Sequence, residues 1–145
     1  MVNGPAQPSI EDLLPHRGRM LLIDEIVTLE LEAAVSRSRV AQTWPLFDGA
    51  GVPAFMVIEL VAQTSGLGNG YHRMLVQGED SEKKGFLVGI KTARFHMEHL
   101  PLGAEIITEA RNRFKFEGFR EIEGVSRIGG EIVGEVTLQV VQAAV

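Results

Sequence analysis

The sequence predicts one α+β domain in which an antiparallel sheet wraps around a single long central helix. Only one segment, residues 53–76, is long and apolar enough for such a helix. Two strand-like segments precede it and four follow it, which is not the regular strand–helix alternation of a parallel sheet. The 145 residues suit one domain, which we assign to residues 9–145, after a loose N-terminal segment at residues 1–8.

The first expected elements are a short helix and two strands. Ser9 can cap a single helical turn in "SIEDLLPH", where acidic residues favour the helix N-terminus and Pro15 ends the turn. The segments "MLLIDEIVTLE" and "AAVSRSRVA" are typical of strands. Small residues alternate with valine and arginine in the second segment, so its two faces should differ in burial.

The central helix follows a loop rich in turn-forming residues, "TWPLFDGAGVP". We expect the helix to begin at Pro53, because the first helical position tolerates the missing N–H of proline, and to end near Val76. Gly66, Gly68 and Gly70 each weaken its second half by up to about 1 kcal/mol relative to alanine. That half must therefore be held by other contacts or must need a close backbone approach.

Only strand signals follow the polar loop "QGEDSEKK". Gly129-Gly130 predicts a two-residue hairpin between two alternating segments, and Glu117-Gly118 is a weaker signal of the same kind. Residues 101–103 should form the turn between the first two of these strands. The four expected strands are "GFLVGIKTARFHM", "AEIITEARNRFKF", "FREIEGVSRI" and "EIVGEVTLQVVQ".

The composition narrows the function classes. With 45% hydrophobic and 23% charged residues the chain is globular, and its net charge of -5 gives no overall attraction to nucleic acid or to anionic lipid. The longest apolar run, Val52 to Ile58, is far shorter than the roughly 20 residues that span a bilayer. No secretory signal is visible and no cysteine occurs, so we expect a cytoplasmic protein that binds neither nucleic acid nor membrane.

Glu59 is the first candidate for chemistry, because it lies in the middle of the apolar helix. A carboxylate in such surroundings is more easily protonated, which suits a general acid, and Gln63 one helical turn later could hydrogen-bond to it. Pairing with an arginine or reaching out to solvent would explain Glu59 equally well. The unpaired N–H groups near Ala54 and Phe55, at the positive end of the helix, could polarise a carbonyl or hold an oxyanion.

Other motifs have a structural interpretation. The spacing Gly49-x-Gly51-x-x-Ala54 matches a loosened dinucleotide fingerprint, but the expected strand before it and parallel crossover after it are missing, so we interpret it as a turn. His96 and His99 flank a strand end, yet a metal site would need further ligands. We therefore expect no metal and no cofactor.

His16 and the lysine-rich loop leave two open questions. His16 stands in a turn before the first strand, where a structural role is favoured over a catalytic one. A group of basic residues could form a patch beside the helix end, either as a solvated face or as a docking site for an acidic carrier protein. The members of this group are Arg73, Lys83, Lys84, Lys91 and Arg94.

Three segments in order resemble the β-hydroxyacyl-acyl carrier protein dehydratase family: "LLPHRGRMLLIDEIV", "VPAFMVIELVAQ" and "GFLVGIKTARFHMEHLPLGAEI". The resemblance covers roughly residues 10 to 115 and implies a hotdog fold. It is nearest to the dehydratase-like subgroup associated with aryl polyene and polyketide-type clusters. In that family a helix acid protonates the leaving β-hydroxyl, an amide at the helix start polarises the thioester carbonyl, and a histidine removes the α-proton.

This chain has a matching residue for two of these three roles. Glu59 matches the acid, and Ala54 takes the place of the glycine whose amide polarises the carbonyl. The family histidine lies fourteen residues before the acid, where this chain has Pro45, and no histidine occurs from there to Glu59. The expected catalytic residues are thus Glu59 and, in reserve, His16. The expected substrate-binding residues are Gly51, Ala54, Phe55 and Gln63.

Three functions remain open from the sequence. The first is a dehydratase of 3-hydroxyacyl thioesters carried by acyl carrier protein or coenzyme A, with Glu59 as acid and an unassigned base. The second is a partner subunit that completes one half-site of a heterodimer, since sites of this family form between two chains. The third is an acyl thioesterase that uses a helix carboxylate. A homodimer or heterodimer is expected, because a sheet this small leaves an edge strand that needs covering.

Overall fold

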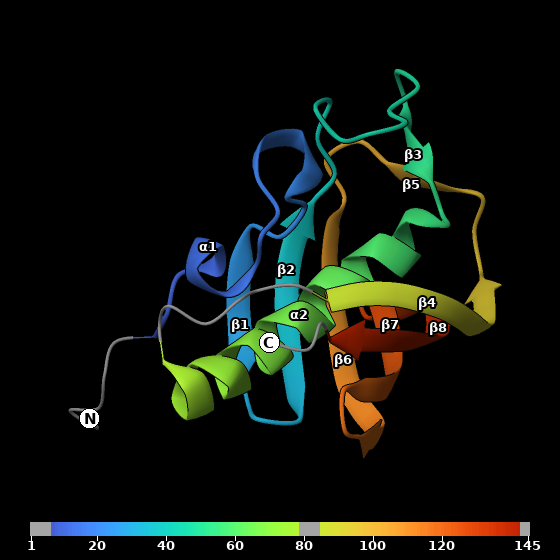
Figure 1. Cartoon of the computed structure of the whole chain (residues 1–145). Helices are drawn as coiled ribbons and strands as arrows, with labels where there is room; N and C mark the ends of the chain where they lie inside the picture. The colour runs from blue at the N-terminus through green and yellow to red at the C-terminus, as the bar shows by residue number, and fades with distance from the viewer. Residues whose placement is uncertain (1–6, 79–84, 143–145) are drawn as a thin grey trace.

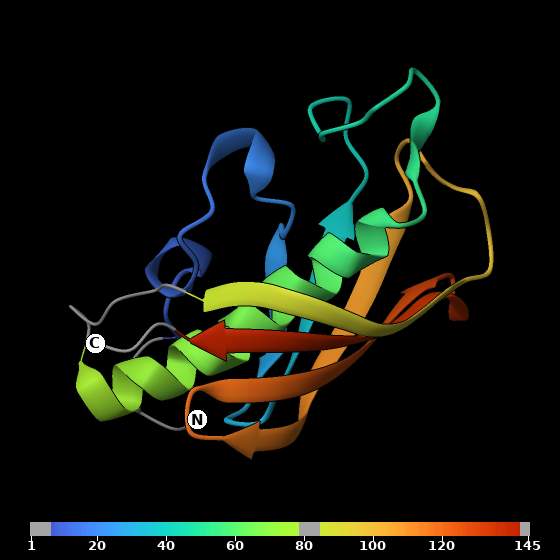
Figure 2. The same cartoon turned by 45° about the vertical axis from the view of Figure 1, so that its right-hand side comes forward.

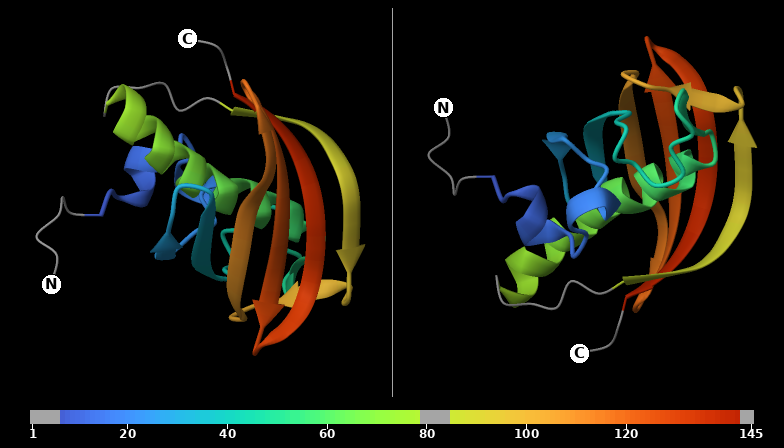
Figure 3. Two further views of the ribbon diagram at one scale, coloured as in Figure 1. Left: turned by 90° about the horizontal axis from the view of Figure 1, so that it is seen from below. Right: turned by 90° about the horizontal axis from the view of Figure 1, so that it is seen from above.

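The computed structural model describes residues 7–78 and 85–142, so most of the expected loose segment and of the polar loop lie outside the described residues. A curved six-stranded antiparallel sheet holds helix α2 (Met56–Gln77) against its concave face (Figure 1; Figure 3). The strand order is β1-β2-β6-β7-β8-β4. The strands are β1 (Glu25–Leu29), β2 (Ala33–Arg39), β4 (Gly85–Phe95), β6 (Glu105–Phe116), β7 (Phe119–Ile128) and β8 (Glu131–Gln142).

The N-terminal helix forms as predicted, but the first strand begins later than expected. Helix α1 (Ile10–Leu13) has a capping box in which Ser9 and Asp12 each bond the other's backbone N–H. A 3₁₀ turn, η1 (Gly18–Met20), follows and β1 starts only at Glu25. The expected strand start at Met20 is wrong, because Leu22 and its neighbours leave the sheet to pack against α2, where Leu22 is fully buried.

Strand β2 confirms the predicted alternation of its faces. Ala34, Ser36 and Ser38 are buried toward the helix, whereas the residues between them are only partly buried. The buried hydroxyls need partners, and the Ser36 Oγ lies 2.8 Å from the Thr64 Oγ1 of α2. A polar layer thus belongs to the contact between sheet and helix.

A second, two-stranded sheet was not predicted. Strand β3 (Gly51–Pro53) pairs with β5 (His99–Pro101), so Pro53 ends a short strand and α2 begins three residues later, at Met56. Three-residue strands carry no readable periodicity, and this is why the expected helix start was wrong. The expected turn at residues 101–103 forms, since the Ala104 N–H donates to the Pro101 carbonyl and Gly103 has φ of 82°, but the strand that it joins to β6 is the short β5 and not β4.

The other turns and the glycines of the helix behave as the sequence indicates. Gly129 and Gly130 have φ of 58° and 85° in the β7–β8 hairpin, and Glu117 has φ of 52° in the β6–β7 turn. In α2, a Cβ built on Gly70 would lie 2.7 Å from the Leu13 carbonyl oxygen. The expected close backbone approach is confirmed at this position, and it packs α1 against the second half of α2.

The two edges of the main sheet differ. Strand β1 is short, and its pairing with β2 is interrupted by a bulge between Ile26 and Thr28, which protects an edge. Strand β4 is 11 residues long and runs along the open margin of the sheet (Figure 2). Within the described ranges, none of the helices has the length and apolar character needed to span a membrane.

Candidate functional site

Glu59 lies one turn into α2, on a stripe of the helix that the sheet does not cover. Its side chain is 36% exposed, while Val57 and Leu60 beside it are fully buried. The helix therefore places the apolar neighbours in the core and Glu59 at a surface. Pairing with an arginine is not observed, because the described partners of Glu59 are a glutamine and a histidine, whereas the partial exposure of Glu59 agrees with a side chain that reaches solvent.

Gln63 fixes one oxygen of that carboxylate. The buried Gln63 Nε2 donates to the Glu59 Oε2 at 2.7 Å and to the Met20 carbonyl at 2.7 Å, and the Leu22 N–H donates to the Gln63 Oε1 at 3.0 Å. The predicted hydrogen bond between Gln63 and Glu59 is present. Gln63 also ties the segment before β1 to the helix, so the position of Glu59 is coupled to the packing of the core.

His16 lies on the other side of the carboxylate. Its Nε2 is 3.5 Å from the Glu59 Oε2, and its side chain is 30% exposed. The turn that carries it is held by Arg17, whose guanidinium donates to the carbonyls of Glu11, Leu14 and His16. The structure thus brings together two residues that are 43 positions apart.

Both neighbouring side chains approach the same oxygen of the Glu59 carboxylate. Gln63 and His16 both approach Oε2, while Oε1 has no hydrogen-bond partner within the described residues. A carboxyl group held in this way keeps a fixed orientation and has one oxygen available for a ligand. This arrangement is suited to proton transfer.

The start of α2 differs from the expectation in one respect. The Ala54 N–H donates to the Glu98 carbonyl at 3.0 Å, so the expectation that this amide is unpaired is wrong. The amides of Phe55 and Met56 have no acceptor among the residues described, and the Phe55 side chain is exposed. Gly51 has a packing role, because a Cβ there would lie 2.2 Å from the Leu100 carbonyl oxygen.

The loop before β3 contains a polar pair that sequence reasoning missed. The Asp48 Oδ1 accepts hydrogen bonds from the Ala50 and Gly51 N–H groups, both at 2.9 Å, and its Oδ2 lies 2.9 Å from the His99 Nε2. These backbone hydrogen bonds, with the help of His99, hold the pKa of Asp48 below its usual range. The β3–β5 pairing brings the two residues together, and no spacing in the sequence indicates it.

The structure excludes one residue, Arg73, from the expected basic patch. Arg73 is buried, and burial together with the nearby Arg120 lowers its pKa, so it is no part of a solvated face. Lys91 pairs with Glu121 at 3.4 Å, whereas Lys83 and Lys84 lie outside the described residues. No group of three or more metal-binding side chains gathers in the described part of the chain.

A long helix held in the concave face of a curved antiparallel sheet, with a carboxylate near the helix start, defines a hotdog-fold protein. The predicted fold is confirmed by a solved structure described as the dehydratase heterocomplex ApeI:P from Xenorhabdus doucetiae. The two chains align with a TM-score of 0.83 over 93% of this chain and 91% of the other, at 22% sequence identity.

Sequence comparison gives the family. The sequence model of the ApeP-like family, described as ApeP dehydratase, matches residues 8–144, and the chain therefore belongs to the ApeP-like dehydratase family. The 3-hydroxyacyl-[acyl-carrier-protein] dehydratase FabZ of Xanthomonas oryzae pv. oryzae is 31% identical over 137 residues, 89% of this chain and 86% of the relative. The expected relationship to these dehydratases is thus confirmed.

A further relative is larger than this chain. The bifunctional enzyme LpxC/FabZ of Chlorobaculum tepidum is 33% identical over 138 residues, which are 90% of this chain. The match spans only 28% of that relative.

Proposed function

We propose that this chain supplies the acid of a 3-hydroxyacyl-thioester dehydratase site, with Glu59 as the general acid. The observation that carries the proposal is the arrangement around Glu59, in which Gln63 and His16 approach Oε2 and Oε1 stays available. Membership of the dehydratase family and the identity with FabZ support the reaction. The substrate is then a 3-hydroxyacyl group on an acyl carrier protein, in fatty-acid or aryl polyene-type biosynthesis.

In this reaction the acid and the base act on adjacent carbons. A base removes a proton from C2, the C2–H electron pair forms the double bond, and the C3–O bond breaks. Glu59 Oε1 donates its proton to the departing hydroxyl, which leaves as water. The thioester carbonyl, which becomes more negative as C2 loses its proton, faces the helix start, where the Phe55 and Met56 amides can donate to it.

In this proposal His16 positions the acid and does not act as the base. Its Nε2 contacts the same oxygen as Gln63, on the side of the carboxylate away from the free Oε1. An imidazole N–H at this place helps to keep the proton of Glu59 on Oε1. His16 is therefore a positioning residue.

The site is completed in a dimer that forms along β4. Ile90 pairs with Leu138 and Phe95 pairs with Gly134, so both lie on the face of the sheet that contacts α2, because paired residues share a face. Nevertheless Ile90 is 48% exposed and Phe95 is 37% exposed. A second hotdog chain would cover these side chains and bring its own helix beside this one.

A heterodimer is the second candidate assembly. Pro45 stands where the family has its histidine, and an imidazole from another subunit could serve the Glu59 half-site. The structural relative described as a heterocomplex supports this assembly for the fold. The partner would be a related subunit that carries the histidine.

The test is dehydration of a 3-hydroxyacyl thioester of acyl carrier protein, followed by the absorbance of the enoyl product. The chain is assayed alone and together with a histidine-bearing dehydratase subunit. Glu59→Gln should lower turnover at the site that uses Glu59 by about 10²-fold or more, because a positioned acid contributes typically 10²–10⁴-fold. Glu131→Gln, which changes an exposed glutamate at the start of β8, is the matched control.

The outcomes separate the candidates. Glu59-dependent turnover by the chain alone supports a self-sufficient dehydratase, and Glu59-dependent turnover only with the second subunit supports the heterodimer. Turnover that is equal in Glu59→Gln and Glu131→Gln contradicts the role of Glu59. Release of free thiol from simple acyl thioesters without dehydration would instead indicate a thioesterase.

A further inference from the structure

We propose that His99, oriented by Asp48, is the general base that this chain contributes in place of the histidine missing at Pro45. This inference rests on the proposed dehydratase function. A base for C2 needs an imidazole with one nitrogen held by an acceptor and the other nitrogen carrying a lone pair. His99 and Asp48 provide this arrangement at the start of α2.

The first step of the argument is the protonation of the pair. Asp48 is ionised, because the Ala50 and Gly51 N–H groups both donate to its Oδ1 and hold its pKa below the usual range. An ionised carboxylate can only accept, so the His99 Nε2 at 2.9 Å from Oδ2 must carry the proton. In the neutral ring Nδ1 then has the lone pair, and it can take a proton from carbon.

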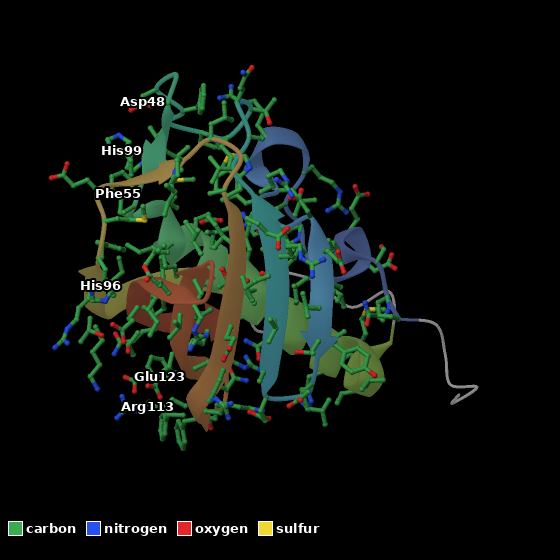
Figure 4. All side chains as sticks on the ribbon, turned by 180° about the vertical axis from the view of Figure 1, so that it is seen from behind. Asp48, Phe55, His96, His99, Arg113 and Glu123 are labelled. Carbon is green, nitrogen blue, oxygen red and sulfur yellow. The ribbon has the colours of Figure 1, made fainter. Side chains whose placement is uncertain are left out.

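The second step is location. Asp48 lies three residues after Pro45, in the same loop, and so close to the place where the family has its base. His99 is paired with Pro53 across β3 and β5, and the Glu98 carbonyl accepts from the Ala54 N–H. Asp48, His99 and Phe55 lie at one end of the molecule (Figure 4). The pair therefore stands beside the helix end where we place the thioester.

The third step is the relation to Glu59. Phe55, the residue that caps α2, lies four positions before Glu59, so the two share a face of the helix, and the Phe55 side chain is exposed at the end of the molecule where Asp48 and His99 lie (Figure 4). In a dimer along β4, His99 of one chain would act with Glu59 of the other. His99 Nδ1 takes the C2 proton, Glu59 loses its proton to the leaving hydroxyl, and proton exchange with water resets both groups.

The chain offers a matched control. His96 Nε2 lies 2.8 Å from Glu135 Oε2, so it forms the same type of exposed histidine–carboxylate pair. His96 directly follows β4 and is not part of the β3–β5 pairing that holds His99. Without a catalytic role, His96→Gln and His99→Gln should have similar effects.

The first experiment measures dehydration by the variants. His99→Gln should lower kcat by about 10²-fold or more, whereas His96→Gln should leave kcat unchanged. Asp48→Asn keeps an oxygen that can accept from Ala50 and Gly51, but its amide would turn His99 to the tautomer with the proton on Nδ1. It should therefore lower kcat with little change of KM or of the unfolding midpoint.

The second experiment is complementation between inactive chains. Co-expressed Glu59→Gln and His99→Gln chains should recover about a quarter of the wild-type activity, because half of randomly mixed dimers hold one intact site out of two. If the wild-type chain works only with a histidine-bearing subunit, Glu59→Gln in that complex should retain the half-site served by His99. Adding His99→Gln to Glu59→Gln should then remove the remaining turnover.

The results distinguish this inference from the function on which it rests. If the wild-type chain shows no turnover either alone or with the histidine-bearing subunit, the proposed function and this inference are both contradicted. Glu59-dependent turnover with equal effects of His99→Gln and His96→Gln contradicts the inference alone. The inference alone is also contradicted if co-expressed Glu59→Gln and His99→Gln chains recover no activity. The same holds if, in the heterodimer, the chain with both substitutions is as active as the chain with Glu59→Gln alone.

Discussion

At the scale of single residues, the two oxygens of Glu59 have different environments. Oε2 is held by Gln63 and approached by His16, and Oε1 has no protein partner in the described ranges. The asymmetry follows from the helix, since Gln63 lies one turn after Glu59 and is anchored at its other end by Met20 and Leu22. The orientation of the acid thus depends on a buried amide.

The first prediction concerns that amide. Gln63→Leu should lower the free energy of unfolding by about 1–3 kcal/mol, because the buried Leu22 N–H loses its acceptor. Urea unfolding measures the change. Glu59→Leu should change stability by only about 0.5 kcal/mol, because Glu59 is partly exposed. Equal losses in both variants would show that Gln63 does not support the fold through this bond.

The second prediction concerns Glu32. Its pKa is lowered from 4.5, chiefly by the hydrogen bond from the Lys115 Nζ at 2.9 Å. A carboxyl group with a lowered pKa in the folded state stabilises above its unfolded pKa, and this contribution is lost as the pH falls through the folded value. Lys115→Met should therefore reduce stability near neutral pH, and the difference should shrink on acidification below pH 4.5.

Urea unfolding at several pH values tests this second prediction. Lys115→Arg keeps the ion pair and should follow the wild-type pH dependence. A constant stability difference between Lys115→Met and the wild type at all pH values would contradict the role of the Glu32–Lys115 pair.

At the scale of elements, the glycines of α2 differ in how closely a backbone atom of another segment approaches them. A Cβ on Gly70 would lie 2.7 Å from the Leu13 carbonyl oxygen, a backbone atom that cannot turn aside. A Cβ on Gly68 would lie 3.4 Å from its nearest neighbour, the Glu30 carbonyl oxygen, which is an ordinary contact. Gly70 is thus required for the packing of α1 on α2, whereas Gly68 is not.

The third prediction uses this contrast. Gly70→Ala should destabilise the protein by about 1–3 kcal/mol through overpacking. Gly68→Ala should stabilise it by up to about 1 kcal/mol, because alanine is the better helix former. Thermal unfolding of the two variants compares them directly. A stabilising Gly70→Ala would show that α1 can move away at little cost.

The same elements show what the sequence could predict. The helix and the six strands of the main sheet were found because each of these segments is long enough to show a pattern in the sequence, and Glu59 with Gln63 was found because helical spacing is local. The β3–β5 sheet was missed because three residues show no period. The Asp48–His99 pair was missed because its members are 51 residues apart and meet only through that short sheet.

At the scale of the whole molecule, the sheet has one protected edge and one open edge. The apolar side chains of β4 that lie on the concave face are exposed in the single chain, and such a patch on a long edge strand is typical of an interface. The assembly and the chemistry are then linked, because a site built from two chains is lost when the chains separate.

The fourth prediction tests this link. Ile90→Lys should convert the dimer to a monomer and abolish dehydration, because a charge would be buried against the second chain. Val27→Lys on the opposite edge, at a residue that is also exposed, should leave both assembly and activity intact. Sedimentation velocity measures the mass of each variant. A dimeric Ile90→Lys protein would place the interface elsewhere.

The loop that precedes β3 also contains the single tryptophan of the chain. Trp44 is 4% exposed and directly precedes Pro45. The backbone N–H of Trp44 donates to the Ala41 carbonyl, and the Trp44 carbonyl accepts from the Phe47 backbone N–H. The tryptophan fluorescence of this protein therefore comes from one indole, in the loop that holds Asp48. Carrier binding, subunit exchange and unfolding can each be followed at that loop without any added label.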